Sequence, residues 1–246
     1  MQVMKRTVRK AEVGKSMMEQ ETIKSEAEKT LVERIDITNQ ISYIPASKNP
    51  LSADVVLIEG EEYLYLFDVG NNEEVAAYLN TLPKKKKVIL SHFHADHTGS
   101  IGRLDFETVY AGPIMEKYYQ YFVPGYEKGQ EPEKYQTVTE VVKISDGVEL
   151  EIHPVPASHA KGSLLVQVDG VYIFLGDAFY SRKKDKKAVY NVQLLKEKIK
   201  LLQELSGEKV FLSHEKRPIK AKNGIIRFLQ RIYEKREKNQ PYIEVS

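Results

Sequence analysis

The sequence of 246 residues contains no cysteine, and this absence limits the chemistry that any site in it can use. Disulfides, thiolate-bound zinc, iron–sulfur clusters and cysteine nucleophiles are all excluded. A metal site must therefore be built from His, Asp, Glu and backbone oxygens. Only six histidines are present, so each can be considered individually.

Long apolar runs are also missing. No stretch approaches the roughly 18 consecutive apolar residues that a membrane-spanning helix needs. The basic N-terminus is not followed by the apolar segment of a signal peptide. We therefore expect a soluble, cytoplasmic protein with no membrane partner.

Charge of either sign is nearly balanced, with 37 Lys and Arg against 35 Asp and Glu and a formal charge of +2. This balance does not by itself indicate a nucleic-acid partner. The expected partner is a small-molecule substrate. Two local basic runs, at residues 84–87 and 182–187, are expected to be solvated.

Two regions differ in texture. Residues 1–30 are polar, with apolar residues loosely spaced as in a helix, which predicts a partly helical N-terminal extension. The full sequence is 41% hydrophobic, and residues 31–246 are long enough to bury a core as one domain.

Short β-rich runs in the second region are separated by compact turns. Asp146-Gly147 and Asp169-Gly170 each lie between two such runs, and Gly60 lies between Val55–Ile58 and Tyr63–Phe67. Asp-Gly between apolar runs is typical of hairpins, because glycine accepts the positive φ of a tight turn. Helices are predicted from Glu73 to Leu79 with Asn72 as the cap, over 192–205, and around 225–232. This order of elements predicts sheets that are covered by helices.

Four apolar strands end in polar residues that can bind or position a metal. They run into Asp68, Ser91-His92, Gly176-Asp177 and Ser213-His214. Strand ends that point the same way meet at one crevice, so a shared site is expected there.

The segment SHFHADHTGS is the densest of these. In an extended chain His92 and His94 project to the same side, and a turn after Ala95 sends Asp96 and His97 elsewhere. The segment can thus serve two adjacent metal positions. Without a cation, such a cluster places desolvated rings together at a cost in free energy.

This H-x-H-x-D-H pattern resembles the signature of the metallo-β-lactamase-fold hydrolases. The other landmarks occur in the order typical of that family, with Asp68 first, then His159 in PASHAKGS, Asp177 in FLGDAF and His214 in FLSHE. The resemblance implies an α/β fold, a four-layer αβ/βα sandwich, with a dinuclear metal centre between two sheets.

The resemblance also implies roles for single residues. The first metal would be held by His92, His94 and His159, the second by Asp96, His97 and His214, with Asp177 as the bridge. Asp68 would accept a hydrogen bond from a ligand imidazole and fix its tautomer. The absent cysteine and the bridging Asp177 favour the glyoxalase II and lactonase-like branch. Zinc is the expected metal, with iron or manganese as alternatives.

Tyr180 follows the expected bridge closely. It resembles a tyrosine that contacts the substrate carbonyl in quorum-quenching lactonases, and a phenol there can stabilise an oxyanion. We therefore expect Tyr180, with Asp96, to be catalytic. The Tyr-rich segment 110–135 is either a lid over the substrate or a helix that packs on the sandwich. His153 is interpreted as an ordinary histidine at the end of a strand.

The motif leaves three activities open. The first is a hydrolase in which two metals activate water to cleave an ester, lactone, thioester or related bond. The second is a dioxygenase for persulfides with one iron, which shares the motif. The third is a phosphodiesterase or nuclease, suggested by the basic run 182–187.

Overall fold

The computed structural model describes residues 32–118 and 133–245. Residues 34–246 form one compact unit. The predicted N-terminal extension lies outside the described residues, as does most of the Tyr-rich segment. Within the described ranges, no helix is long and apolar enough to cross a bilayer. The cytoplasmic location stays a prediction.

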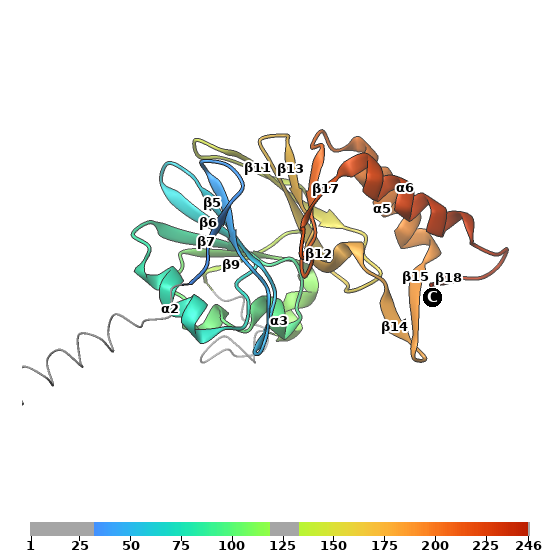
Figure 1. Ribbon diagram of the computed structural model, residues 1–246, viewed down its shortest axis with the longest axis horizontal. Coiled ribbons are helices and arrows are strands. Elements are labelled where there is room, and N and C mark those ends of the chain that lie inside the picture. Colours follow the sequence, from blue (N-terminus) through green and yellow to red (C-terminus); the bar gives the residue numbers. More distant parts are fainter. Residues whose placement is uncertain (1–31, 119–132, 246) are drawn as a thin grey trace, which may run out of the picture. The chain divides into compact units, whose positions relative to one another are not determined.

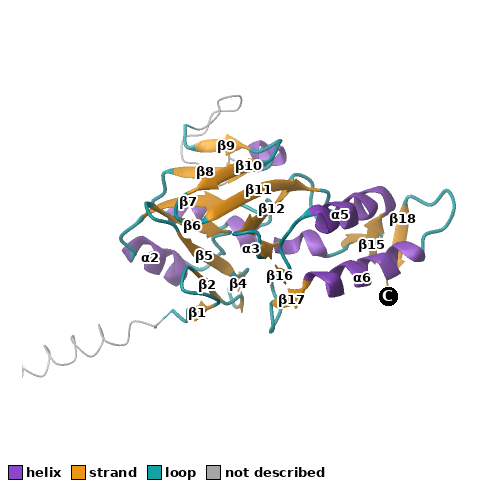
Figure 2. Ribbon diagram, turned by 90° about the horizontal axis from the view of Figure 1, so that it is seen from above, coloured by secondary structure: helices purple, strands orange, loops and turns teal. Residues whose placement is uncertain are grey.

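Two mixed sheets form the centre of the unit (Figures 1 and 2). The seven-stranded sheet has the order β1-β2-β5-β6-β7-β8-β9, with bounds Ile35–Asp36, Ile41–Ile44, Val55–Glu59, Tyr63–Phe67, Lys85–Ile89, Thr108–Ala111 and Tyr135–Thr137. The six-stranded sheet has the order β10-β11-β12-β13-β16-β17, with bounds Val142–Ser145, Glu149–Val155, Ser163–Val168, Tyr172–Phe174, Lys209–Phe211 and Ile219–Ala221.

Smaller elements complete the unit. A three-stranded sheet has the order β14-β15-β18, with bounds Arg182–Lys184, Lys187–Asn191 and Tyr242–Val245. A two-stranded sheet pairs β3 with β4, at Ser47–Lys48 and Leu51–Ser52. Among the described residues, the α-helices are α2, α3, α5 and α6, at Glu73–Thr81, Ala95–Thr98, Val192–Glu204 and Lys222–Glu234. The 3-10 helices η1, η2 and η3 span Ile101–Arg103, Pro113–Tyr118 and Gly176–Phe179.

The two large sheets pack face to face through their apolar side chains. Phe67 of the first sheet contacts Phe174 of the second, with ring centroids 6.2 Å apart, and Tyr43 meets Phe211 edge-on at 5.1 Å. Residues of both sheets belong to one buried cluster. Burial of this apolar surface is the main stabilising contribution to the sandwich.

Helices cover the outer faces, which completes the four-layer α/β arrangement that the resemblance implied. On the second sheet, buried leucines and isoleucines of α5 and α6 pack against Leu165, Ile173 and Val210. On the first sheet, α2 buries Val75, Ala76 and Leu79, and it lies along the face away from the second sheet (Figure 2). The helix begins as predicted, because the Asn72 side chain accepts from the backbone N–H of Glu74 and Val75.

The predicted hairpins are confirmed, since β5 pairs with β6, β10 with β11, and β12 with β13, all antiparallel. The prediction that His153 ends a strand is wrong. β11 continues to Val155, and β10 pairs with it only as far as Ile152. Beyond that point β11 is an edge strand on one side, so Pro154, which has no N–H to donate, is accommodated.

Lys198 of α5 is fully buried among apolar side chains. Its Nζ donates to the carbonyl oxygen of Ala178 at 2.5 Å and to that of Phe179 at 3.4 Å. Burial lowers the pKa of Lys198 to about 7. The lysine thus ties α5 to η3, the element that carries Asp177.

This burial predicts that stability rises with pH above about pH 7. The unfolded chain keeps the Lys198 proton up to its ordinary pKa, and the folded chain releases it near pH 7. Unfolding therefore takes up a proton between these values, and the lysine contributes a slope of at most about 1.4 kcal/mol per pH unit. Lys198→Met should remove this contribution in urea unfolding between about pH 7 and pH 9.5, whereas Lys200→Met, an exposed lysine of the same helix, should keep it. An unchanged slope in Lys198→Met would contradict the assignment.

Candidate metal centre

The predicted site residues come together at one end of the sandwich, where parallel strands of both sheets finish. β6 and β7 are parallel neighbours in the first sheet, and β13 and β16 are parallel neighbours in the second. Asp68 and His92 follow the first pair, and Asp177 and His214 follow the second. His159 lies in the connection between β11 and β12. The side chains at these strand ends thus come together, as the sequence predicts.

The seven predicted ligands form overlapping groups that could hold metal ions. These groups are His92 with His94 and His159, His92 with His97 and Asp177, and Asp96 with His97 and His214; within each, the donor atoms lie within 4.8 Å of one another. Five of the six histidines take part. His153 instead lies 3.3 Å from Glu151, on β11.

The first group cannot be satisfied by hydrogen bonds alone. His94 Nδ1 lies 2.9 Å from His92 Nε2 and 3.0 Å from His159 Nε2. One ring nitrogen carries at most one proton, so it cannot donate to both neighbours. Burial lowers the pKa of His92 well below its usual value, and the neighbouring imidazoles lower it further. A cation between three neutral imidazoles resolves this conflict, so the residues present fit a divalent metal.

The outward-facing nitrogens fix the tautomers of the rings. His159 Nδ1 lies 3.1 Å from the carbonyl oxygen of Ser181, which can only accept, so this nitrogen carries the proton and Nε2 presents its lone pair. His97 Nδ1 lies 2.7 Å from Asp68 Oδ2, so Nδ1 carries the proton in His97 as well and Nε2 presents its lone pair. Hydrogen-bonded partners of this kind orient metal-binding imidazoles.

Asp68 is the centre of a buried network. Its Oδ1 accepts from the backbone N–H of Ser91 at 2.7 Å, and its Oδ2 accepts from Ser91 Oγ at 2.7 Å. Ser91 Oγ also lies 3.0 Å from His92 Nδ1. Burial alone would lower the pKa of His97, but the carboxylates of Asp68 and Asp177 together outweigh burial and raise it. One carboxylate therefore orients two of the five rings.

Asp177 lies between the two groups. Its Oδ2 is 3.4 Å from His159 Nε2, and its Oδ1 is 3.5 Å from His97 Nε2 and 3.6 Å from His214 Nε2. Oδ1 is buried without a hydrogen-bond partner. A buried carboxylate oxygen left unpaired costs free energy, and a cation would remove that cost. The two oxygens face different groups, so this carboxylate is within reach of both.

Gly176 allows Asp177 to approach the first sheet. It has a φ of 51°, and a Cβ at this position would lie 2.7 Å from the Ser91 side chain. Both features disfavour any residue other than glycine.

Asp96 and His214 form the open side of the second group. His214 Nε2 lies 3.3 Å from Asp96 Oδ2 and 3.3 Å from His97 Nε2. Burial would raise the pKa of Asp96, but the hydrogen bond from His214 and the charge of His97 lower it to about 2. The same contact with Asp96 raises the pKa of His214.

Tyr180 does not lie among these donors. Its hydroxyl donates to the carbonyl oxygen of Ser213 at 2.6 Å. The catalytic role expected of Tyr180 stays a prediction, and donation to a substrate would require this bond to break.

Sequence reasoning missed several residues that hold the ligands in place. The sequence names Ser91 only as the residue before His92, with no role of its own, and it gives no indication of Asp54, whose Oδ2 accepts from the backbone N–H of His214 at 2.8 Å. A signal for the serines is present, because Ser-His occurs at three of the site segments, as Ser91-His92, Ser158-His159 and Ser213-His214. All three serines are buried. Asp54 has no comparable signal.

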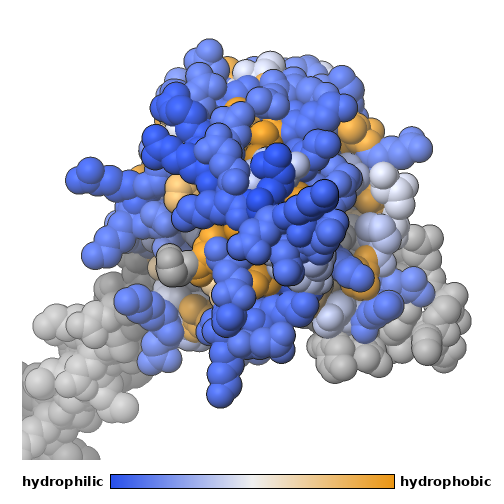
Figure 3. All heavy atoms as spheres, turned by 90° about the vertical axis from the view of Figure 1, so that its right-hand side faces the viewer, coloured by the Kyte–Doolittle hydropathy of each residue, from blue (hydrophilic) through white to orange (hydrophobic). Residues whose placement is uncertain are grey.

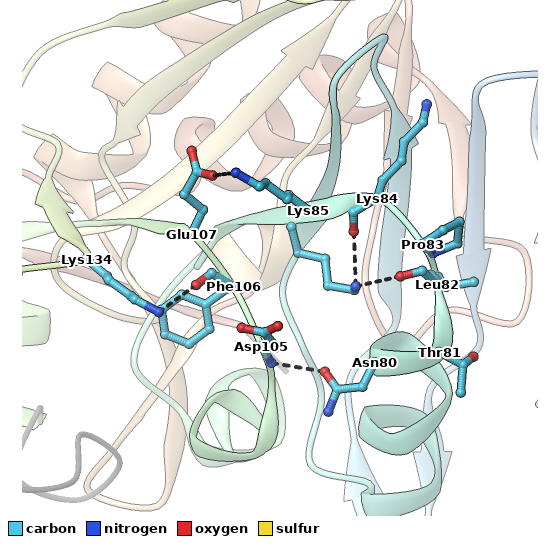
Figure 4. Close-up of a pocket in the computed structure, with 11 residues that line it drawn as sticks. Asn80, Thr81, Leu82, Pro83, Lys84, Lys85, Asp105, Phe106, Glu107 and Lys134 are labelled. Atoms are coloured by element: carbon cyan, nitrogen blue, oxygen red, sulfur yellow. Dashed lines mark hydrogen bonds and ion pairs between the residues drawn. The ribbon is translucent and has the colours of Figure 1, made fainter.

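A pocket of about 520 Å³ lies at the other end of β7 and contains none of the predicted site residues (Figure 4). Lys86 is buried there, and its Nζ donates to the carbonyl oxygens of Leu82 and Lys84. Lys85 pairs with Glu107 at 3.2 Å. These side chains satisfy one another, so the metal-binding chemistry is assigned to the histidine cluster.

Comparison with known proteins agrees with the fold. The sequence profile described as "Metallo-beta-lactamase superfamily" matches residues 49–214. An archaeal metallo-β-lactamase superfamily protein from Sulfolobus tokodaii is similar in structure, with a TM-score of 0.58, 19% identity, and coverage of 85% of this chain and 91% of that chain.

Two further structures are similar at lower identity. A B3 metallo-β-lactamase with an active-site glutamic acid has a TM-score of 0.61 at 13% identity, over 86% of this chain and 93% of that chain. A flavo-diiron protein variant from Thermotoga maritima has a TM-score of 0.60 at 11% identity, over 84% of this chain and 62% of that chain. No curated protein sequence matches the chain.

The Asp68 network predicts that Asp68→Asn weakens metal binding by about 10-fold to 100-fold. The amide cannot supply two acceptor oxygens to Ser91 and His97, so the tautomers of His92 and His97 are no longer fixed. Chelator competition with zinc would measure the affinity. Asp146→Asn is the matched control, because Asp146 accepts from backbone N–H groups of Glu62 and Tyr63 away from the histidines. Equal affinities in both variants would refute the role of Asp68.

Proposed function

The chain belongs to the metallo-β-lactamase superfamily, and we propose on that basis that it is a metal-dependent hydrolase of an ester, lactone, thioester or related bond. The observation that carries this proposal is the convergence of five imidazoles and two carboxylates, with ring nitrogens facing inward. The substrate is expected to be a small molecule.

Two divalent cations, zinc in the first place with iron or manganese as alternatives, would supply an activated water at neutral pH and a Lewis acid for the substrate oxygen. His92, His94 and His159 would hold one cation, and Asp96, His97 and His214 the other, with Asp177 shared between them.

The chain's own residues supply the proton transfer. Asp96 is ionised at neutral pH, because its pKa is held at about 2. Its carboxylate can therefore accept a proton from the attacking water and pass it to the leaving group. Burial favours the neutral forms of His92 and His94, so these rings keep their lone pairs available as ligands.

A second candidate, phosphodiester hydrolysis, is favoured by the distribution of charge. Residues 181–246 carry 18 Lys and Arg against 8 Asp and Glu, a formal charge of +10, whereas residues 1–180 carry 19 against 27, a formal charge of −8. The basic hairpin β14–β15 starts directly after Ser181, whose carbonyl accepts from His159. The face at this end of the unit is predominantly hydrophilic (Figure 3). A phosphate-bearing substrate would complement it.

Metal removal tests the main proposal. Chelation should abolish hydrolysis across a panel of lactone, thioester, β-lactam and phosphodiester substrates, and zinc should restore it. His94→Ala and Asp177→Ala should each lower kcat/KM by more than about 100-fold, since loss of a ligand exceeds the usual effect of losing its hydrogen-bond partner. His153→Ala is the control and should retain activity, because His153 lies outside the cluster.

Elemental analysis of the same preparations separates the alternatives. Two equivalents of zinc support the hydrolase. One iron per chain, with oxygen uptake on glutathione persulfide, would favour the dioxygenase instead. Absence of bound metal, or hydrolysis unchanged in His94→Ala, would refute the proposal.

Salt dependence tests the second candidate. Phosphodiester turnover should fall steeply between about 50 and 200 mM salt, because counterions compete for the basic hairpin. Lys183→Glu with Lys186→Glu, two exposed hairpin positions, should raise KM for phosphodiesters and leave that for a neutral ester unchanged. A salt-independent KM for the phosphodiester would exclude this use of the hairpin.

A further inference from the structure

His214 of the second group differs from His159 of the first group in the way it is held. His159 is oriented through its ring nitrogen, which donates to Ser181. His214 is instead held through its backbone. Its φ is 66°, a conformation that non-glycine residues adopt infrequently. Something must hold this peptide if the imidazole is to stay in reach of Asp96 and His97.

Both polar groups of one peptide bond, between Ser213 and His214, are bound by side chains. Asp54 Oδ2 accepts from the N–H of His214 at 2.8 Å. Tyr180 donates its hydroxyl proton to the C=O of Ser213 at 2.6 Å. Asp54 Oδ2 also accepts from Ser213 Oγ at 3.1 Å, so the peptide is fixed from two sides.

Asp54 is itself rigidly placed. It is 5% exposed, and its Oδ1 accepts from the backbone N–H of Ala46 at 3.1 Å. The neighbouring Ala53 donates its N–H to the carbonyl oxygen of Asp96 at 2.8 Å. The segment before β5 therefore binds the backbones of both Asp96 and His214, two of the three donors in the second group.

We propose that Asp54 and Tyr180 clamp the Ser213–His214 peptide and thereby set the affinity of the second metal position without changing that of the first. This inference rests on the two-metal site proposed above. Both are positioning residues, since neither contacts the donors of the first group. Under this proposal Tyr180 acts on the loop that carries His214, which is an alternative to the predicted contact with a substrate carbonyl.

The test is zinc stoichiometry and affinity in the full chain, measured by elemental analysis and chelator competition. Asp54→Asn keeps the size of the side chain but removes its charge, and Tyr180→Phe removes only the hydroxyl. Each variant should keep one tight zinc with the wild-type affinity and bind the second about 10-fold to 100-fold more weakly. The double variant should bind the second zinc only slightly more weakly than the single variant with the lower affinity, because both side chains hold one peptide.

Tyr190→Phe is the matched control. Tyr190 is buried and donates its hydroxyl to the carbonyl oxygen of Phe179 at 2.9 Å, so it loses the same kind of bond away from His214. It should bind both zinc ions as the wild type does. Equal weakening of the second zinc in this control would overturn the clamp, as would unchanged affinity in Tyr180→Phe.

The remaining outcomes separate this inference from the proposed function. A wild type that binds fewer than two zinc ions refutes the two-metal site and the clamp with it. If the wild type binds two and Tyr180→Phe binds both normally but loses kcat, Tyr180 acts on the substrate and the clamp is overturned alone. If Asp54→Asn does not fold, Tyr180→Phe still decides the question.

Discussion

Five imidazole rings meet at one end of the sandwich, and the distribution of their protons is the constraint on which the site depends. His94 Nδ1 cannot donate to both His92 and His159 at about 3 Å. The N–H of His159 points outward to a carbonyl oxygen, and that of His97 points outward to Asp68. The lone pairs therefore remain at the centre, and a cation is the partner that such an arrangement can accept.

The packed sandwich holds the backbone of the site residues in strained conformations. Positive φ angles occur at Asp68, Gly176 and His214, each within three residues of the end of an apolar strand. Backbone strain of this kind persists only where the surrounding structure fixes it, and here the two packed sheets do so. The apolar cluster between the sheets thus stabilises the positions of ligands that would otherwise repel or relax apart.

Local chemistry explains which features could be predicted from the sequence. Asn72 caps α2, and Asp-Gly turns close hairpins, because both depend on residues close together in the chain. Convergence of the strand ends also followed from pattern alone. The four layers did not, since periodicity shows which residues are buried but not which face packs on which sheet. The family resemblance supplied that arrangement.

The residues that sequence reasoning missed share a long-range character. Asp54 and His214 are separated by 160 positions and belong to loops of different sheets, so no spacing in the sequence links them.

Tyr180 was placed near the bridge correctly, but the partner of its hydroxyl depends on where the β16 loop lies in space. Lys86 belongs to a basic run expected to be solvated, yet it is buried, and its ammonium donates to the carbonyl oxygens of Leu82 and Lys84, just after the end of α2. In each case the side chain satisfies a backbone group whose position is set by tertiary packing, and only the folded chain reveals it. The predicted ligands are recognisable because metal chemistry restricts their residue types, whereas many residue types can hold a peptide in place. The supporting residues therefore carry the information about this chain that the ligand motif does not.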